Sequence, residues 1–507
     1  MGPAKLCYSL RVTTCTELRE AVENFIAKAV QPSLLDTGEE PLALVQGQWE
    51  LREWNGRVVL EAWDGERSLA RKIVRLGEQR HDRLTLVTER FPKAEGETRI
   101  ADLAAPAGVE MRRKTSRLAF TARFRLLLTR EFPEWSVTGV SAEPNLEQSL
   151  SPLYARALLR RGSQWMAAVA APPDSADPAG IVAQGLIWLA WLRQREKNAA
   201  MGRLFLFLPS GDERDAAQRA CFLNPQAVIC HMRTYDERDR VASVELSDIG
   251  NASSTLPPCH RPTTPNSGPD SIPAFDGVDR VPQSDGSVRF EVRGLEFARW
   301  SGSRMTCGIS QPRRCSLHEL EAMADEVARV RRADADDLQH PLYTRYPEGW
   351  LESAVRALPQ ALDAALLSSP LYGQVPVFIA PGRDVVDLLG VDYTGRVVVI
   401  ELKASPDLQL PFQALDYWTR VNRHLVAGDF ERQGYFPGVT LRRDPPRILL
   451  AAPALAFHST TETVLSFLAP GIEITRVGLA EDWRRQLRVM FRLTGAQRPD
   501  DAIRVNE

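Results

Sequence analysis

Runs of alternating apolar and polar residues predict β-structure in the N-terminal part of the chain. Residues 49–54 and the more apolar residues 57–63 flank Asn55-Gly56, a pair that supplies both positive-φ residues of a type I′ turn, so they predict a β-hairpin. Residues 83–87 repeat the strand pattern. We therefore predict a β-rich N-terminal domain over residues 1–105. Its tryptophans are interpreted as core or half-buried sheet residues rather than as a binding face. They are Trp49, Trp54 and Trp63.

The C-terminal half begins with a strand pattern at 288–293, followed by apolar residues at helical spacing between Leu317 and Val330. From residue 341 helices and strands alternate, which is typical of an α/β protein. We expect a mixed central sheet flanked by helices. The predicted elements are a helix around 350–358, strands at 384–391 and 396–402, a helix at 411–425, a strand at 447–452, a helix at 460–468 and a strand at 485–493.

Residues 250–287 separate the two halves. They are rich in Pro, Ser, Gly and Thr and have little periodicity, so they predict a linker. The expected organisation is a β-rich domain (1–105), an α/β domain (106–249), this linker, a connecting strand and helix (288–340) and a second α/β domain (341–507).

The two halves share a sequence pattern. Phe222-Leu223-Asn224-Pro225 matches Phe467-Leu468-Ala469-Pro470, and residues 203–209 match 447–453. Further upstream, 145–147 lies over 350–352 in the same alignment. Because order and spacing agree, the pattern predicts a duplicated α/β unit.

Composition excludes some classes of protein. The formal net charge is −2, with 44% hydrophobic and 25% charged residues, which argues against a wholly electrostatic nucleic-acid binder. The N-terminus lacks a basic segment followed by an apolar one, and the longest apolar stretch, 181–192, is too short to span a bilayer. Seven cysteines without paired spacing indicate free thiols. We expect a cytoplasmic protein with no membrane partner.

The candidate chemistry centres on Lys403, the only lysine after Lys197. Glu401 lies two residues earlier in the same apolar run, so both side chains point to one face of a strand. Asp387 lies in another apolar strand, where an unpaired carboxylate is costly. In a hairpin of these strands Asp387 meets Glu401 and Lys403, and two acids plus water suit Mg²⁺ or Mn²⁺. Such a metal would activate water against a phosphodiester, while Lys403 would orient or deprotonate that water or offset the developing charge.

Other polar residues extend or compete with this constellation. Gln413 and Tyr417 are four apart on the next predicted helix and share a face that can reach substrate phosphate. Asp384 is the rival of Asp387, but it lies on the opposite face of its strand. His424 is interpreted as structural. Zinc is not expected at the Cys and His residues between Cys221 and His260, because none forms a close Cys-x-x-Cys pair.

The ordered set Asp387, Glu401-Leu402-Lys403 and Gln413-Ala414-Leu415-Asp416-Tyr417, with Glu352 on a preceding helix, resembles the PD-(D/E)XK nuclease superfamily. The Gln-x-x-x-Tyr element resembles its RecB-like branch, and residues 384–403 resemble the archaeal and bacterial NucS-type endonucleases. The resemblance covers about residues 341–500 and implies a restriction-endonuclease-like fold. One departure is Val386, which stands where the motif has Pro before its Asp.

The resemblance also implies roles for these residues. Asp387 and Glu401 would bind the divalent metal, and Lys403 would support the nucleophilic water. Glu352 would bind the metal directly or through a neighbouring group, whereas Gln413 and Tyr417 would contact DNA.

The sequence therefore predicts a Mg²⁺-dependent nuclease acting on DNA, with its active site in the C-terminal domain. Residues 157–171 contain no carboxylate, so the N-terminal α/β copy is expected to be degenerate. The alternative is a non-catalytic nucleic-acid-binding or assembly protein that keeps the nuclease fold. The sequence has no Gly-rich Lys-Ser/Thr loop and no Gly-x-Ser-x-Gly elbow, so we expect no nucleotide cofactor. The sequence is also compatible with a homo-oligomer.

Overall fold

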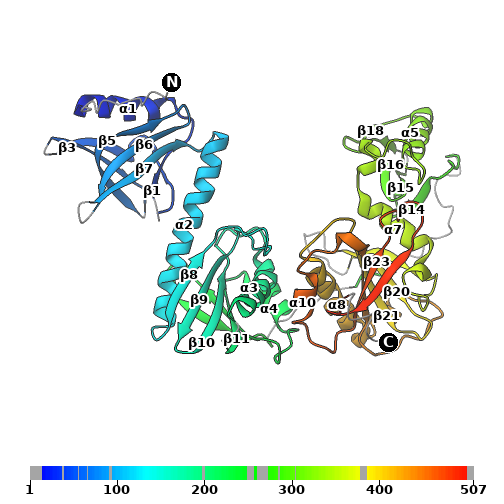
Figure 1. Ribbon diagram of the computed structural model, residues 1–507. Coiled ribbons are helices and arrows are strands. Elements are labelled where there is room, and N and C mark those ends of the chain that lie inside the picture. The colour runs from blue at the N-terminus through cyan, green and yellow to red at the C-terminus, as the bar shows by residue number, and fades with distance from the viewer. Residues whose placement is uncertain are drawn as a thin grey trace, which may run out of the picture.

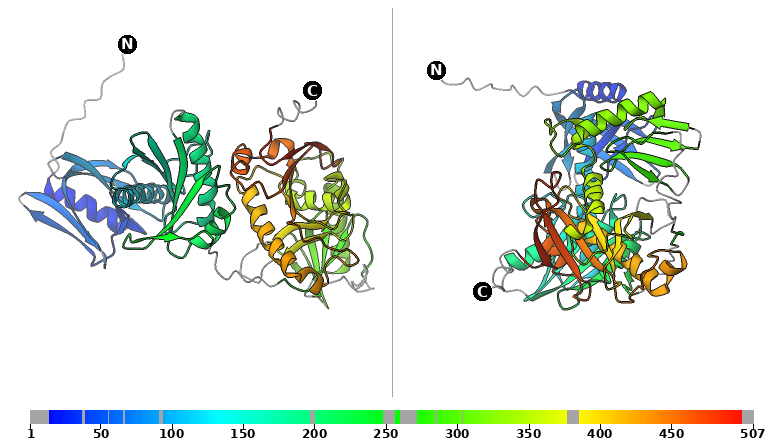
Figure 2. Two further views of the ribbon diagram at one scale, coloured as in Figure 1. Left: turned by 90° about the horizontal axis from the view of Figure 1, so that it is seen from below. Right: turned by 90° about the vertical axis from the view of Figure 1, so that its right-hand side faces the viewer.

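The computed structural model describes residues 14–498 except 37–38, 55, 66, 91–93, 197–199, 248–255, 260–271, 284–285, 303 and 377–384. Within these ranges a seven-stranded, a six-stranded, a five-stranded and a second six-stranded sheet follow one another along the chain. The six-stranded sheets belong to two α/β domains that meet in the middle of the molecule. The other two sheets lie on the same side of that pair (Figures 1 and 2). The chain is thus a mixed α/β protein with a β-rich N-terminal region.

The N-terminal sheet is antiparallel and has the order β2-β1-β7-β6-β5-β4-β3. Helix α1 (Cys15–Lys28) packs its apolar face on this sheet and begins with a capping box between Thr14 and Glu17. The predicted hairpin is present, with Gly56 at φ 67° in its turn. Trp54 is 70% exposed, so it is neither a core nor a half-buried residue. The strands are β1 (Pro32–Asp36), β2 (Leu42–Ala43), β3 (Trp49–Trp54), β4 (Arg57–Trp63), β5 (Ser68–Gln79), β6 (Arg83–Arg90) and β7 (Ala94–Asp102).

The first α/β domain follows the long helix α2 (Pro106–Glu131), which connects it to the N-terminal sheet (Figure 1). Its sheet has the order β13-β12-β11-β10-β9-β8. Helix α2 packs on β8 and β9, while α3 packs on β10 and β11. The elements are β8 (Ser136–Ser141), β9 (Ala155–Arg161), β10 (Gln164–Ala170), α3 (Ile181–Arg195), β11 (Ala200–Pro209), α4 (Glu213–Ala220), β12 (Ile229–Tyr235) and β13 (Val241–Val244).

The second α/β domain has the sheet order β19-β20-β21-β22-β23-β24. Helix α8 covers β21 and β22, and α7 contacts β20 and β21. The strands are β19 (Tyr372–Pro376), β20 (Val385–Val391), β21 (Val397–Leu402), β22 (Arg447–Pro453), β23 (Ile474–Leu479) and β24 (Val489–Thr494). The helices are α6 (Pro341–Thr344), α7 (Pro347–Ala357), α8 (Leu410–Ala427), α9 (Asp429–Arg432) and α10 (Thr461–Leu465).

The two six-stranded sheets have the same succession of pairings. In each, the first three strands pair antiparallel, the third, fourth and fifth pair parallel, and the sixth returns antiparallel. One part of the sequence alignment is wrong. Residues 145–147 lie in a turn after β8, whereas 350–352 lie in α7, before β19.

Two matched segments of the halves contact each other directly. Leu223 and Leu468 form an antiparallel bridge, and the flanking hydrogen bonds are reciprocal: Asn224 N–H donates to the Phe467 carbonyl, and Ala469 N–H to that of Phe222, each at 2.8 Å. Around this bridge α10 packs on α3 and α4 packs on α8. A single buried apolar cluster includes residues of both α/β domains. The interface is therefore isologous within one chain.

The segment between the α/β domains corrects several expectations. Strand β14 (Asp279–Pro282) lies in the predicted linker 250–287, and the region 288–340 is more than a connecting strand and helix. It contains the rest of an antiparallel meander, β15 (Val288–Val292), β16 (Leu295–Ser301), β17 (Arg304–Cys307) and β18 (Arg313–Arg314), followed by α5 (Leu317–Val330). Cys307 and Cys315 form a disulfide, so these two cysteines are not free thiols.

Element boundaries in the second α/β domain also differ from the sequence prediction. The last helix spans 461–465 rather than 460–468, and the last strand 489–494 rather than 485–493. Strands β19 and β23 were not predicted. Among the described helices, none has the length and apolar character that crossing a membrane requires.

Candidate functional site

The hairpin of β20 and β21 brings the three predicted residues together. Leu388 pairs with Ile400, so Asp387 and Glu401 occupy the next positions of the ladder. Lys403 lies directly beyond β21, where its backbone N–H donates to the Ala451 carbonyl of β22 at 3.0 Å. The strands form because both are apolar runs buried between helical layers. The charged residues therefore stand at one end of a buried hairpin.

Short contacts fix the acids and the ammonium. Asp387 Oδ2 accepts from the Leu402 backbone N–H at 2.9 Å. The Lys403 Nζ lies 3.9 Å from Glu401 Oε1 and 3.6 Å from Asp407 Oδ2. Glu401 is 3% exposed, and its Oε2 is buried without a hydrogen-bond partner among the described residues. A buried carboxylate oxygen in this state is costly unless a proton or a cation satisfies it.

Burial and mutual repulsion perturb the acids strongly. Burial raises the pKa of Asp387 to about 7, against the lowering effect of the Leu402 hydrogen bond, and Glu352 adds to the rise. Burial and then the Asp387 charge raise the pKa of Glu401 well above its usual value. Burial alone would lower the pKa of Lys403, but Glu401 and other acids outweigh it, so the pKa is raised. The site therefore favours a cation among its acids.

Helix α8 carries the next two predicted residues past the hairpin. Gln413 and Tyr417 line the same cleft as Asp387, Glu401 and Lys403. The Gln413 Oε1 atom is buried and lacks a hydrogen-bond partner in the described part of the chain. Tyr417 is half-buried and packs against the apolar cluster under the hairpin. Gln413 and Tyr417 thus form part of the cleft wall next to the hairpin.

Helix α7 contributes acids from a second direction. Glu352 is 8% exposed and accepts a hydrogen bond from Arg356, and its charge acts on Asp387. Glu348, one turn earlier, acts on Asp387, Glu401 and Lys403. Sequence analysis missed Glu348. The i,i+4 spacing of the two glutamates, which puts both on one helix face, is the signal that could have found it.

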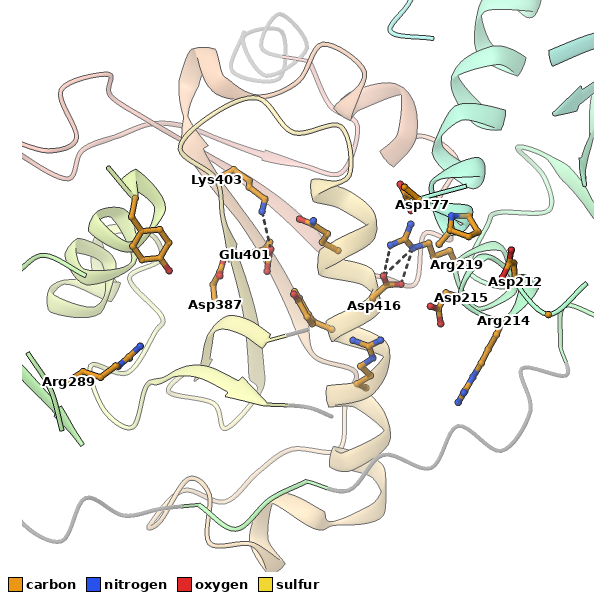
Figure 3. Close-up of a pocket in the computed structure, with 18 of the residues that line it drawn as sticks. Asp177, Asp212, Arg214, Asp215, Arg219, Arg289, Asp387, Glu401, Lys403 and Asp416 are labelled. Atoms are coloured by element: carbon orange, nitrogen blue, oxygen red, sulfur yellow. Dashed lines mark hydrogen bonds and ion pairs between the residues drawn. The ribbon is translucent and has the colours of Figure 1, made fainter. Parts of the chain in front are cut away.

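These residues open into a cleft of about 1260 Å³ that three parts of the chain line. Figure 3 shows Asp387, Glu401 and Lys403 between Arg289 on one side and α8 on the other, with Asp416 facing Arg219 and Arg214 beyond. Arg289 and Arg299 come from the five-stranded sheet, and residues 176–179 and 211–219 of the first α/β domain supply the far wall. None of these was predicted, because they are distant in sequence from the site.

In the first α/β domain the equivalent positions hold different residues. Ala171 N–H donates to the Phe207 carbonyl at 3.0 Å, as Lys403 does to Ala451, so Ala171 stands where Lys403 does. Two residues earlier, Val169 matches Glu401, and its ladder partner Arg156 matches Asp387. The Arg156 guanidinium is buried and donates to the carbonyls of residues 143, 151 and 154. An arginine in this position excludes a metal cation.

The polar groups of Gln184 and Trp188 on α3 form hydrogen bonds within the first α/β domain. Gln184 Oε1 accepts from Ser151 N–H at 2.9 Å, and its Nε2 donates to the Ser149 carbonyl at 3.1 Å. The Trp188 indole donates to the Ala157 carbonyl at 3.1 Å. The Gln184 amide thus has hydrogen-bond partners for both its oxygen and its nitrogen, whereas the Gln413 oxygen has none among the described residues.

The remaining candidates of the sequence do not extend the site. His424 is 2% exposed and its Nδ1 lies 2.7 Å from Asp429 Oδ2, which is a structural contact. Asp384 lies outside the described residues. The described residues contain no group of three His, Cys, Asp or Glu arranged to hold a metal. A metal at Asp387 and Glu401 would accordingly keep several water ligands, as Mg²⁺ does.

Comparison with known proteins finds no matching family model, no matching curated protein and no matching solved structure.

Proposed function

We propose that this chain is a divalent-metal-dependent nuclease that hydrolyses phosphodiester bonds of DNA at Asp387, Glu401 and Lys403. The observation that carries the proposal is the buried Glu401 carboxylate, whose Oε2 has no hydrogen-bond partner among the described residues, beside Asp387 and Lys403 in an open cleft. In structural ion pairs the buried polar atoms normally all have hydrogen-bond partners within the protein. This set leaves an oxygen without one and faces a space large enough for a polymer segment.

Asp387 and Glu401 are the residues that would hold Mg²⁺ or Mn²⁺. Both carboxylates are hard oxygen donors, and the perturbed acids gain most from a cation. When bound, the metal would polarise the phosphodiester and lower the pKa of a water. Glu348 and Glu352, both on α7, add negative charge close to Asp387.

Lys403 then acts as a charged group rather than as a base. Its raised pKa keeps the ammonium protonated near neutral pH, so it can orient a water and offset the charge that develops on the phosphoryl oxygens. Gln413 and Tyr417 line the same cleft, where the amide N–H groups of Gln413 and the Tyr417 side chain would contact the substrate. The arrangement supports hydrolysis by attack of water.

We also infer that the two α/β domains descend from one duplicated unit with a restriction-endonuclease-like sheet. The shared order of pairings and the reciprocal contacts of Leu223 and Leu468 support this inference. With Arg156, Val169 and Ala171 at the active positions, the first copy has no means of holding a metal. Its role would be to form the far wall of the cleft.

The test is cleavage of labelled single-stranded, duplex and branched DNA with and without Mn²⁺. Glu401→Gln and Lys403→Met should each lower the rate by roughly 10²- to 10⁴-fold. Glu321→Gln, an exposed acid of α5, is the control and should cleave normally. Cleavage that survives both active-site changes would remove this site from consideration.

Calorimetry separates the proposal from the non-catalytic alternative. A nuclease should bind Mn²⁺ in a way that Asp387→Asn and Glu401→Gln abolish. A nucleic-acid-binding or assembly protein should bind DNA without any Mn²⁺ binding that depends on these residues.

A further inference from the structure

Two arginines stand directly opposite each other on the five-stranded sheet. Arg289 of β15 pairs with Arg299 of β16, and the next charged pair, Glu291 and Glu296, is also opposed across the strands. Like charges in directly opposite positions destabilise a sheet. Both cations therefore lie side by side on the hairpin, each next to a carboxylate of its own strand.

The arginines are held in place by acids of their own strands. Arg289 Nε lies 2.9 Å from Glu291 Oε1, and Arg299 Nε lies 2.8 Å from Glu296 Oε1. Arg299 also donates its Nη2 to Glu296 Oε2 at 2.9 Å, so Glu296 holds that guanidinium through two hydrogen bonds. Both arginines line the cleft that contains Asp387 and Glu401. The glutamates therefore orient the pair toward the cleft.

The hairpin that carries the arginines is fixed beside the active site. The Arg331 side chain is fully buried and donates to the carbonyls of Val292 and Arg293 at the hairpin turn. It also donates to the carbonyls of Leu342 and Arg345, just before α7. The arginine pair thus has a fixed position relative to α7 and its two glutamates.

Close backbone packing adds a second connection. Gly294 in the turn has φ 73°, and a Cβ there would collide with the Gly349 carbonyl of α7. Glycine is needed at this position for both reasons.

We propose that Arg289 and Arg299 form a phosphate-binding site that holds the nucleic-acid strand next to the bond being cleaved. This inference rests on the proposed function and gives the five-stranded sheet a substrate-positioning role. The floor of the cleft is acidic and repels a polyanion, so cations beside it are needed to retain the strand. Guanidinium groups suit the task because they present paired N–H groups to phosphate oxygens. Phosphate contacts fix register without reading sequence.

The test is binding of a fluorescein-labelled single-stranded oligonucleotide in EDTA, where no cleavage occurs, followed by fluorescence anisotropy over a salt series. Arg289→Ala with Arg299→Ala should weaken binding at least tenfold at low salt. It should also reduce the slope of log K against log salt by about 1.4, since each single-strand phosphate contact contributes about 0.7.

The matched control is Arg313→Ala with Arg314→Ala. These arginines are exposed on β18 of the same sheet and do not line the cleft. The control removes the same number of charges as the test variant. Because these charges lie outside the cleft, its affinity and salt slope should stay close to those of the wild type. Equal losses in the two double variants would show that only net charge matters and would overturn the proposal.

A second variant guards against misfolding. Glu291 is 9% exposed, so removing Arg289 alone leaves a buried charge. Arg289→Gln with Glu291→Gln and Arg299→Gln removes cations and the buried acid together, and it should show the same weakened binding. Wild-type affinity in this folded variant would overturn the proposal.

The outcome is separable from that of the nuclease proposal. Glu401→Gln should lose Mn²⁺ binding and cleavage yet keep the oligonucleotide affinity and salt slope. The arginine variants should keep Mn²⁺ binding. If no DNA is cleaved but the arginine pair alone controls binding, the phosphate site stands and the nuclease proposal falls. If the oligonucleotide does not bind wild-type protein, the phosphate site falls.

Discussion

Arg219 of the first α/β domain forms a two-pronged ion pair with Asp416 of the second. Its Nη2 lies 2.8 Å from Asp416 Oδ2, and its Nε lies 3.1 and 3.3 Å from the two carboxylate oxygens (Figure 3). Their side chains are 10% and 16% exposed, respectively. Asp416 directly precedes Tyr417 on α8, so the pair ties the first α/β domain to the helix that borders the proposed active site.

Breaking this pair should uncouple the domains. Arg219→Met leaves Asp416 as a buried charge without its guanidinium, so we expect a loss of about 3 kcal/mol in the free energy of unfolding. Urea denaturation followed by tryptophan fluorescence measures it. Removing both charges in Arg219→Met with Asp416→Leu should recover most of the loss. A double variant as unstable as the single one would mean that the pair is not coupled.

Arg331 should be one of the most sensitive residues outside the site. Its guanidinium is fully buried and donates to four backbone carbonyls. Arg331→Met leaves those carbonyls without donors, and we expect a loss of about 3 to 5 kcal/mol. Differential scanning calorimetry should show a lower melting temperature.

The same variant should also bind DNA less tightly, because the hairpin of Arg289 and Arg299 is no longer fixed beside α7. Arg329→Met, an exposed change at the end of α5 just before Arg331, is the control and should alter stability by less than about 0.5 kcal/mol. Unchanged stability in Arg331→Met would contradict the assigned role.

Sequence patterns predicted the elements whose periodicity is local. The hairpin of 385–402 and helix α8 were found because apolar runs and i,i+4 spacing are visible without the fold. Strand β23 was missed because Arg476 interrupts it. That arginine is 3% exposed and is satisfied by Glu462 and the Gly495 carbonyl, which are distant in sequence. Sequence alone does not supply such partners.

The site was predicted in part for the same reason. Asp387 and Glu401 lie on two adjacent strands and Lys403 directly follows the second, so a hairpin suffices to bring them together. Arg289 and Arg219 reach the cleft only through packing between domains, which no local pattern encodes. Arg156 shows the limit within one domain, because only the strand register reveals that it occupies the position of Asp387.

Metal binding should depend steeply on pH near neutrality. Burial raises the pKa of Asp387 to about 7, and burial and the Asp387 charge raise the pKa of Glu401 well above its usual value. A metal binds the ionised acids and must displace their protons. The Mn²⁺ affinity should therefore rise from pH 6 to pH 8, by up to about tenfold per pH unit for each proton released.

The metal-free protein should show the opposite trend in stability. A carboxyl whose pKa is raised on folding stabilises the fold while protonated, and that contribution is lost as pH rises from about 4 through 7. Saturating Mn²⁺ should restore stability at pH 8 more than at pH 6. Thermal unfolding at both pH values, with and without Mn²⁺, measures this. A metal-induced shift that does not change with pH would argue against binding at these acids.

Gln184 of α3 and Gln413 of α8 should respond in opposite ways to the same substitution. Gln184→Ala removes the partners of two part-buried backbone groups at Ser149 and Ser151, so we expect a loss of about 1 to 2 kcal/mol in stability. Gln413→Ala removes an oxygen that has no hydrogen-bond partner among the described residues, so its stability loss should be smaller. Cleavage should follow the reverse order, with Gln413→Ala impaired and Gln184→Ala close to normal. Urea denaturation and the cleavage assay on both variants check this. Impaired cleavage in Gln184→Ala at temperatures where it stays folded would mean that the first α/β domain takes a direct part in the reaction.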